Sequence, residues 1–273
     1  MTSNTGLTRP VRRLFHRDQL GLPEGWRDIL APRSAQWALL TEDERTRLGE
    51  LADALARTKR FEAARGFQIT DEVRTLIAGH AALLVLGLGE SAYDGVGTIV
   101  VRGRAMTRTA PMAGPARGVL MDAPGAVDGE AHASDGPIMV VWSSARREAA
   151  NPAWGRDVVL HEFSHKLDML DGTMDGTPLI DDDDLRARWV DVLTAEYRAV
   201  RTGADGWLRA YAGTNPAEFF AVATEAFFTL PAAMQQDKPA LYDVLSTYYR
   251  QDPAARVRAA LLRQQLAHPA QPS

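Results

Sequence analysis

Apolar residues recur with helical spacing along most of the chain, and short runs that favour strands interrupt this pattern near its middle. The segment 41–63 opens with a capping box of Thr41 and Glu44 and continues with leucines on one helical face, which predicts an amphipathic helix. A second helix is predicted from about 70 to 86, again opened by a threonine and two acids. Its apolar composition predicts that it is central and buried.

Beyond these helices the periodicity changes. The runs 97–103 and 137–144 are apolar, rich in β-branched residues and bounded by Gly, Pro or Ser, which predicts a small sheet. The segment 112–135 is rich in Gly, Pro, Ala and Asp, which predicts a surface loop. Five further helices are predicted at 157–170, 183–201, 215–229, 239–250 and 253–266.

The order of helices, a few strands and more helices predicts an α+β fold rather than a wound parallel sheet. Residues 1–23 are polar, basic and interrupted by prolines, and they predict a flexible N-terminal arm. We expect one domain over 24–266, with a helical N-terminal part at about 24–88 and a catalytic part at about 89–266. Residues 267–273 would form a C-terminal tail.

The amino-acid composition limits which catalytic and metal-binding groups the protein can use. The 273 residues include no cysteine, so a disulfide scaffold, a thiolate nucleophile and a Cys-based zinc site are excluded, and any metal site must use His and carboxylates. The net charge of −4 argues against direct nucleic-acid binding. No apolar run approaches the roughly 20 residues of a membrane span, and no secretory signal is evident, which predicts a cytoplasmic protein without membrane contact.

The candidate chemistry lies in the sequence HEFSH at 161–165. On a helix, His161 and His165 lie on one face, one turn apart, and can bind a single cation. Glu162 lies beside the first histidine, where it could reach a metal-bound water without binding the metal. The alternative is a solvated helix face that carries two histidines.

A peptidase zinc site needs a third protein ligand and an open position. No third histidine follows at metzincin spacing, so a carboxylate is expected. Glu218 and Glu225 lie seven residues apart on one stripe of the apolar helix 215–229, and spacing alone leaves open which would bind the metal and which would support a ligand. Asp168 could orient a ligand or could end its helix.

These motifs together resemble one protein family. The segment HEFSHKLD and the pattern Y-x-x-T-N-P-A-E-F-F-A-V-x-T-E-x-F-F at 211–228 resemble the Mlc titration factor A family of bacterial zinc-dependent peptidases, which are distantly similar to the catalytic domain of anthrax lethal factor. The resemblance extends from about 37 to 253. It implies a zincin-like fold with an HExxH active-site helix and a small β-sheet, packed against N-terminal helices.

The resemblance also implies the roles of individual residues. The zinc ligands would be His161, His165 and Glu218. Glu162 would be the catalytic base, Tyr211 would face the reacting carbonyl and Glu225 would support the ligands from behind.

Two functions remain open at this stage. The first is a Zn²⁺-dependent peptidase, aminopeptidase-like, with a peptide or protein as substrate. The second, which the resemblance suggests, is a regulatory factor that sequesters an Mlc-like transcriptional repressor, with catalysis secondary. A purely structural zinc is disfavoured, because three ligands beside a glutamate leave a position open.

Overall fold

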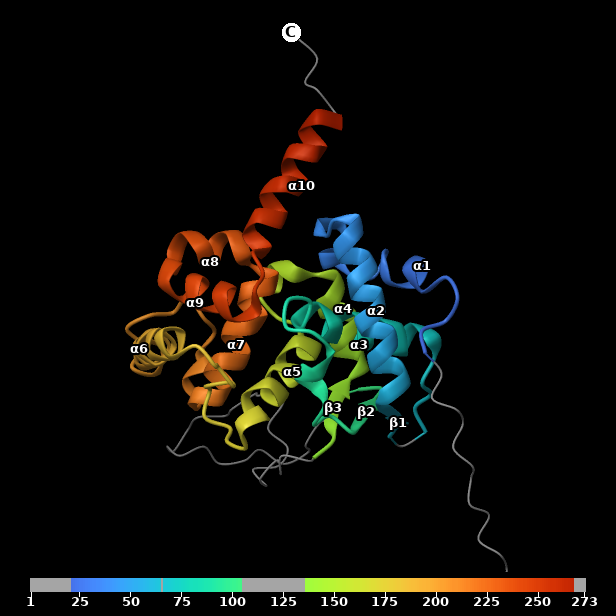
Figure 1. The fold of residues 1–273 in the computed structure, drawn as a ribbon, viewed down its shortest axis with the longest axis horizontal. Coiled ribbons are helices and arrows are strands. Elements are labelled where there is room, and N and C mark those ends of the chain that lie inside the picture. The colour runs from blue at the N-terminus through green and yellow to red at the C-terminus, as the bar shows by residue number, and fades with distance from the viewer. Residues whose placement is uncertain (1–20, 65, 105–135, 268–273) are drawn as a thin grey trace, which may run out of the picture.

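The computed structural model describes residues 21–64, 66–104 and 136–267. These residues form a set of packed helices with a small sheet at one side (Figure 1). The α-helices are α1 (Trp26–Leu30), α2 (Glu42–Thr58), α3 (Asp71–Leu84), α4 (Trp142–Ala150), α5 (Val158–Asp168), α6 (Asp183–Arg201), α7 (Pro216–Thr229), α8 (Pro231–Asp237), α9 (Pro239–Tyr249) and α10 (Pro253–Ala267). The strands are β1 (Arg60–Ala63), β2 (Thr98–Arg102) and β3 (Ile138–Val141). Short 3-10 helices are η1 (Ala35–Leu39), η2 (Glu90–Tyr93), η3 (Pro152–Trp154), η4 (Met169–Asp171) and η5 (Ala210–Gly213).

Helix α2 begins as its capping box predicts, since the Thr41 side chain accepts from the Glu44 amide and the Glu44 carboxylate accepts from the Thr41 amide. The predicted end at 63 is wrong, because the helix stops at Thr58 and Arg60–Ala63 forms β1. This strand pairs along its whole length with β2, so the partner strand decides its conformation. The N-terminal part that was expected to be helical therefore contributes one strand to the sheet.

The three strands are parallel and follow the order β1-β2-β3. Ile99 and Val101 of β2 are buried, and Ile99 pairs in register with Phe61 on one side and Ile138 on the other. The fold is rich in helices with one small sheet, which is compatible with the predicted α+β class. The parallel pairing was not expected, and α3 provides the crossover from β1 to β2.

The strand predicted at 137–144 is too long. It ends at Val141, and Trp142–Ala150 forms α4. Helix α4 buries Ala145, Glu148 and Ala149, which recur at helical spacing and face the core. The β-branched run thus ends with the strand, and burial of this face favours the helix that follows.

The later helices agree closely with the sequence. Helix α6 spans the predicted residues, with the Asp182 carboxylate accepting from the Leu185 amide at its start. The helix predicted at 215–229 ends as α7 at Thr229. Pro231 then opens α8, which was not predicted, because proline is well suited to a first helical position. In Figure 1, α6, α8 and α9 lie on one side of the molecule, the sheet lies on the other, and α10 projects outward.

Two helices form the centre of the fold. Helix α3 buries all of its residues from Thr75 to Leu84, and α7 buries every residue from Phe219 to Thr229. Helix α5 packs against both of them, so it lies between the N-terminal helices and the C-terminal ones. Its position decides where the HEFSH segment lies.

Several predictions concern residues outside the described ranges: most of the arm at 1–23, the loop at 112–135 and most of the tail at 267–273. Among the described residues, no single helix is long and apolar enough to cross a membrane, whereas α7 and α8 together pass that test by length and composition although they are bent by 113°.

Candidate metal centre

Helices α5 and α7 carry the candidate ligands, and polar caps fix where each helix begins. Asp157 precedes α5, and its Oδ1 accepts from the amides of Val159 and Leu160 at 3.0 and 3.1 Å. Asn215 precedes α7, and its Oδ1 accepts from the Glu218 amide at 2.9 Å. The two helices pack against each other. This packing brings residues 161 and 165 on α5 to the first turn of α7.

The two histidines and Glu218 form one cluster. The Nε2 atoms of His161 and His165 lie 3.1 and 3.7 Å from Oε2 of Glu218, and one nitrogen or oxygen atom from each of the three residues lies within 4.8 Å of the others. The imidazole rings are nearly perpendicular, with centroids 4.9 Å apart. Glu218 Oε2 is buried, and among the described residues it has no hydrogen-bond partner of standard geometry.

Charge in the cluster is strongly coupled. Burial by itself raises the pKa of the Glu218 carboxyl, but the two histidines that face it outweigh burial and hold this pKa well below its usual range. Burial by itself lowers the pKa of His161, but the Glu225 and Glu218 carboxylates outweigh burial and raise it to about 10. Protons and a metal cation would therefore compete for the imidazole nitrogens and the Glu218 carboxylate.

Glu225 lies behind His161 rather than in the cluster. Its Oε1 accepts from His161 Nδ1 at 2.7 Å, and its Oε2 accepts from the Asp157 amide at 2.8 Å. Arg209 donates to both oxygens, at 2.5 and 3.1 Å. Because the carboxylate can only accept, His161 Nδ1 donates, and Nε2 is the ring nitrogen that faces Glu218. The two glutamates that spacing could not tell apart thus lie in different places.

Tyr211 and Glu162 lie beside the cluster. Tyr211 is on η5, with its ring centroid 6.1 Å from that of His161. Burial, and then the charge and hydrogen bonding of Glu218, raise the pKa of the Tyr211 hydroxyl well above its ordinary value, so it stays protonated and can donate. Glu162 follows His161 on α5 and is half-buried, and its negative charge contributes to the raised pKa values of both His161 and Tyr211.

Asp168 is buried at the end of α5. Its Oδ2 accepts from the Gly176 amide at 3.0 Å, which fixes the loop that follows the helix. Among the described residues, Asp168 Oδ1 and His165 Nδ1 are both buried and have no hydrogen-bond partner, so support of His165 by this carboxylate is not seen. Burial raises the pKa of Asp168 to about 6.

Gly176 also determines how this loop meets α7. Its φ is +83°, and a Cβ at this position would lie 2.5 Å from the Pro216 carbonyl oxygen. Only glycine fits both the conformation and the space.

Two polar residues of this region were not singled out from sequence. Arg209 holds Glu225, and its only sequence signal is that it lies two residues before Tyr211. Asp157 was identified only as the start of a helix, and its contact with Glu225 depends on a residue 68 positions away. Local patterns cannot reveal such pairs.

The donor set fits a zinc ion. Tetrahedral Zn²⁺ with nitrogen and oxygen ligands at about 2.0–2.2 Å separates neighbouring ligand atoms by about 3.3–3.5 Å. The separations of 3.1 and 3.7 Å from Glu218 Oε2 to the two imidazole nitrogens bracket this value. The buried oxygen and the two imidazole nitrogens, once deprotonated, supply three ligands, and an open fourth position is typical of catalytic zinc.

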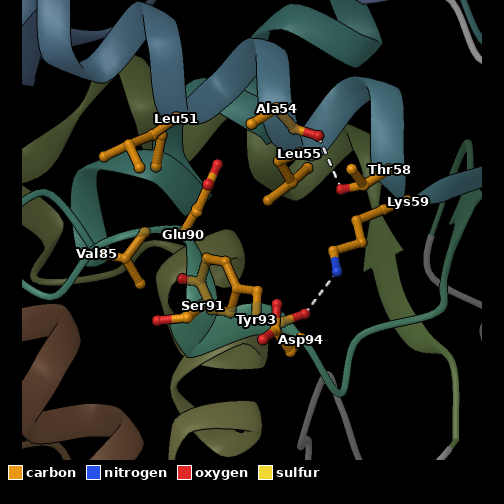
Figure 2. Close-up of a pocket in the computed structure, with 11 residues that line it drawn as sticks. Leu51, Ala54, Leu55, Thr58, Lys59, Val85, Glu90, Ser91, Tyr93 and Asp94 are labelled. Carbon is orange, nitrogen blue, oxygen red and sulfur yellow. Dashed lines mark hydrogen bonds between the residues drawn. The ribbon is translucent and has the colours of Figure 1, made fainter.

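A separate pocket lies between α2, the end of α3 and η2 (Figure 2). Its volume is about 330 Å³, and Leu51, Leu55 and Val85 provide apolar walls. Lys59 Nζ donates to the Tyr93 carbonyl oxygen at 2.6 Å across its edge. None of the clustered residues lines this pocket, so it does not belong to the metal centre.

Comparison with known proteins gives concordant matches. The sequence profile of the family described as glucose-regulated metallo-peptidase M90 matches residues 8–250. An uncharacterized protein of Synechocystis sp. is 32% identical over 89% of this chain and 88% of its own. Mlc titration factor A of Edwardsiella ictaluri is 32% identical over 81% and 85%, and that of Serratia proteamaculans is 30% identical over 89% and 93%. The resemblance predicted from the motifs is confirmed.

Proposed function

This chain belongs to the glucose-regulated metallo-peptidase M90 family, and we propose that it is a zinc-dependent peptidase with His161, His165 and Glu218 as metal ligands. The family makes it a metallopeptidase that acts on peptides or proteins. The observation that supports the zinc site is the convergence of two imidazole nitrogens on one buried, unpartnered carboxylate oxygen. A solvated helix face with two histidines would not place a glutamate from another helix between them.

The zinc ion, when bound, supplies Lewis acidity that activates water and polarises a peptide carbonyl. Glu162 accepts the proton of the attacking water and returns a proton to the leaving amine. The protonated Tyr211 hydroxyl donates to the carbonyl oxygen as negative charge develops there. Glu225 keeps the proton of His161 on Nδ1, so that Nε2 stays available as a ligand.

The decisive experiment compares Glu162→Gln with the wild type. We expect about one zinc per chain in both proteins, and hydrolysis reduced by at least about 10²-fold in the variant, since the base is removed while every ligand stays. Glu90→Gln is the matched control, because Glu90 is exposed on η2 and outside the cluster. Normal turnover by Glu162→Gln would remove this residue from the proposed role.

The next question is whether the enzyme removes residues from the N-terminus of a peptide or cleaves within it. We propose an aminopeptidase-like activity, which predicts faster hydrolysis of peptides with a free N-terminus than of the same peptides acetylated at that end. Equal rates on both substrates would indicate an endopeptidase. The predicted cytoplasmic localisation stays a prediction.

A second candidate function rests on the name that two relatives carry, Mlc titration factor A. We propose as the alternative that the protein sequesters an Mlc-like repressor without needing catalysis. Titration calorimetry of purified Mlc with wild type, Glu162→Gln and zinc-depleted protein tests this directly. Equal binding by all three supports the alternative, whereas absence of binding by the wild type refutes it.

A further inference from the structure

Three polar side chains outside the metal cluster form a buried chain of hydrogen bonds. Ser34 lies just before η1, His80 lies in α3 and Asp157 lies just before α5. His80 Nε2 lies 2.9 Å from Ser34 Oγ, and His80 Nδ1 lies 2.5 Å from Asp157 Oδ2. Asp157 accepts only, so His80 Nδ1 donates to it, and His80 Nε2 forms its hydrogen bond with the Ser34 hydroxyl.

This arrangement has the atom order of a serine hydrolase triad, but its surroundings exclude that chemistry. The exposed fractions of Ser34, His80 and Asp157 are 7%, 2% and 2%, so a substrate cannot reach the hydroxyl. Asp157 also uses its other oxygen to cap α5. Any role of these hydrogen bonds must therefore be structural, through the residues that they position.

The series of hydrogen bonds continues from Asp157 to the metal centre. The Asp157 amide donates to Glu225 Oε2 at 2.8 Å, and His161 Nδ1 donates to Glu225 Oε1 at 2.7 Å. The Asp157 carbonyl also accepts from the His161 amide at 2.9 Å, one helical turn later. Asp157 thus fixes both the start of α5 and the carboxylate behind a proposed ligand.

We propose that His80 is a positioning residue for the metal site, and that through Asp157 it couples the N-terminal helices to the affinity for zinc. The proposal rests on the proposed function, since it takes His161 as a zinc ligand. Among the described side chains, only His80 donates a hydrogen bond to the Asp157 carboxylate, and it holds Oδ2 while Oδ1 caps α5. Without it, Asp157 turns toward other donors, and the first turn of α5 loses its fixed position relative to Glu225.

A matched pair of substitutions tests the donor itself. The amide of His80→Asn occupies the place of Nδ1 and can still donate to Asp157, whereas the amide of His80→Gln occupies the place of Nε2 and reaches Ser34 instead. We measure zinc affinity of the apoproteins by competition with a chromophoric chelator, and record the visible spectrum of the Co²⁺ forms, which reports ligand geometry. We expect His80→Gln to bind zinc about tenfold more weakly and to shift the Co²⁺ bands, and His80→Asn to stay within about threefold of wild type.

Leu48→Ala is the control for general destabilisation, since Leu48 is buried in α2 and takes no part in the network. We expect it to lower the melting temperature and leave zinc affinity unchanged. Wild-type affinity in His80→Gln, or an equal loss in Leu48→Ala, overturns the proposal while leaving the zinc site intact. If His80→Gln does not fold, His80→Ala decides in its place, since it also lacks a donor to Asp157: weaker zinc binding supports the proposal, and unchanged binding overturns it. A wild type that binds no zinc refutes the proposed function as well.

Discussion

Replacing Arg209 by methionine tests how the buried carboxylate of Glu225 is kept charged. Glu225 is 2% exposed and receives four hydrogen bonds, of which Arg209 donates two. Its pKa is lowered because, although burial raises it, the positive charge and hydrogen bonds of His161 and Arg209 outweigh burial. The substitution keeps a long apolar side chain and removes the cation.

The expected loss follows from these contacts. Breaking a buried ion pair by removing one partner costs about 3–5 kcal/mol. The Arg209 side chain is 25% exposed, so water can partly replace it, and we expect the free energy of unfolding of the apoprotein to fall by about 2–3 kcal/mol. Arg209→Lys should lose about half as much, because an ammonium group retains the charge without the two-pronged geometry.

Urea denaturation of the apoproteins, followed by far-UV circular dichroism, measures this loss. Arg47→Met is the control, since Arg47 forms an exposed ion pair with Glu50 and should change stability by less than about 0.5 kcal/mol. In a Glu225→Gln background, Arg209→Met should cost less than about 1 kcal/mol, because no buried charge is left without a partner. An effect of Arg209→Met as small as that of the control, or an equal loss in both backgrounds, would refute the reasoning.

Two further predictions concern Asp168 and Tyr211. The folded-state pKa of Asp168 is about 6 against an ordinary 3.8, so the folded protein binds this proton more tightly and loses stability as pH rises from about 4 to 6. Asp168→Asn should therefore make the apoprotein more stable than wild type by roughly 1–3 kcal/mol at pH 7 and give little gain at pH 4. Urea titrations at the two pH values measure this gain, and an equal gain at both would contradict the raised pKa of Asp168. Tyr211→Phe should lower kcat by about 10²–10³-fold with zinc content unchanged, because it removes one donor to the developing oxyanion. A change confined to KM in steady-state assays would argue against this role of Tyr211.

The sequence determined those features whose signals lie within one segment. The starts of α2, α6 and α7 were predicted because each is set by a side chain that caps amides two or three residues away. The pairing of His161 with His165 likewise follows from helical spacing alone, whereas the choice of Glu218 over Glu225 as a ligand, and the role of Tyr211, came from the family resemblance.

Only the tertiary structure decided the features that depend on distant partners. Residues 60–63 became a strand because β2 pairs with them, and α4 formed because its apolar face is buried. Packing of α5 against α7 separated Glu218 from Glu225, which local spacing left equivalent. The contacts of Arg209 with Glu225 and of His80 with Asp157 span 16 and 77 residues, and periodicity and capping cannot encode pairs at such separations, because these act only over a few turns of chain.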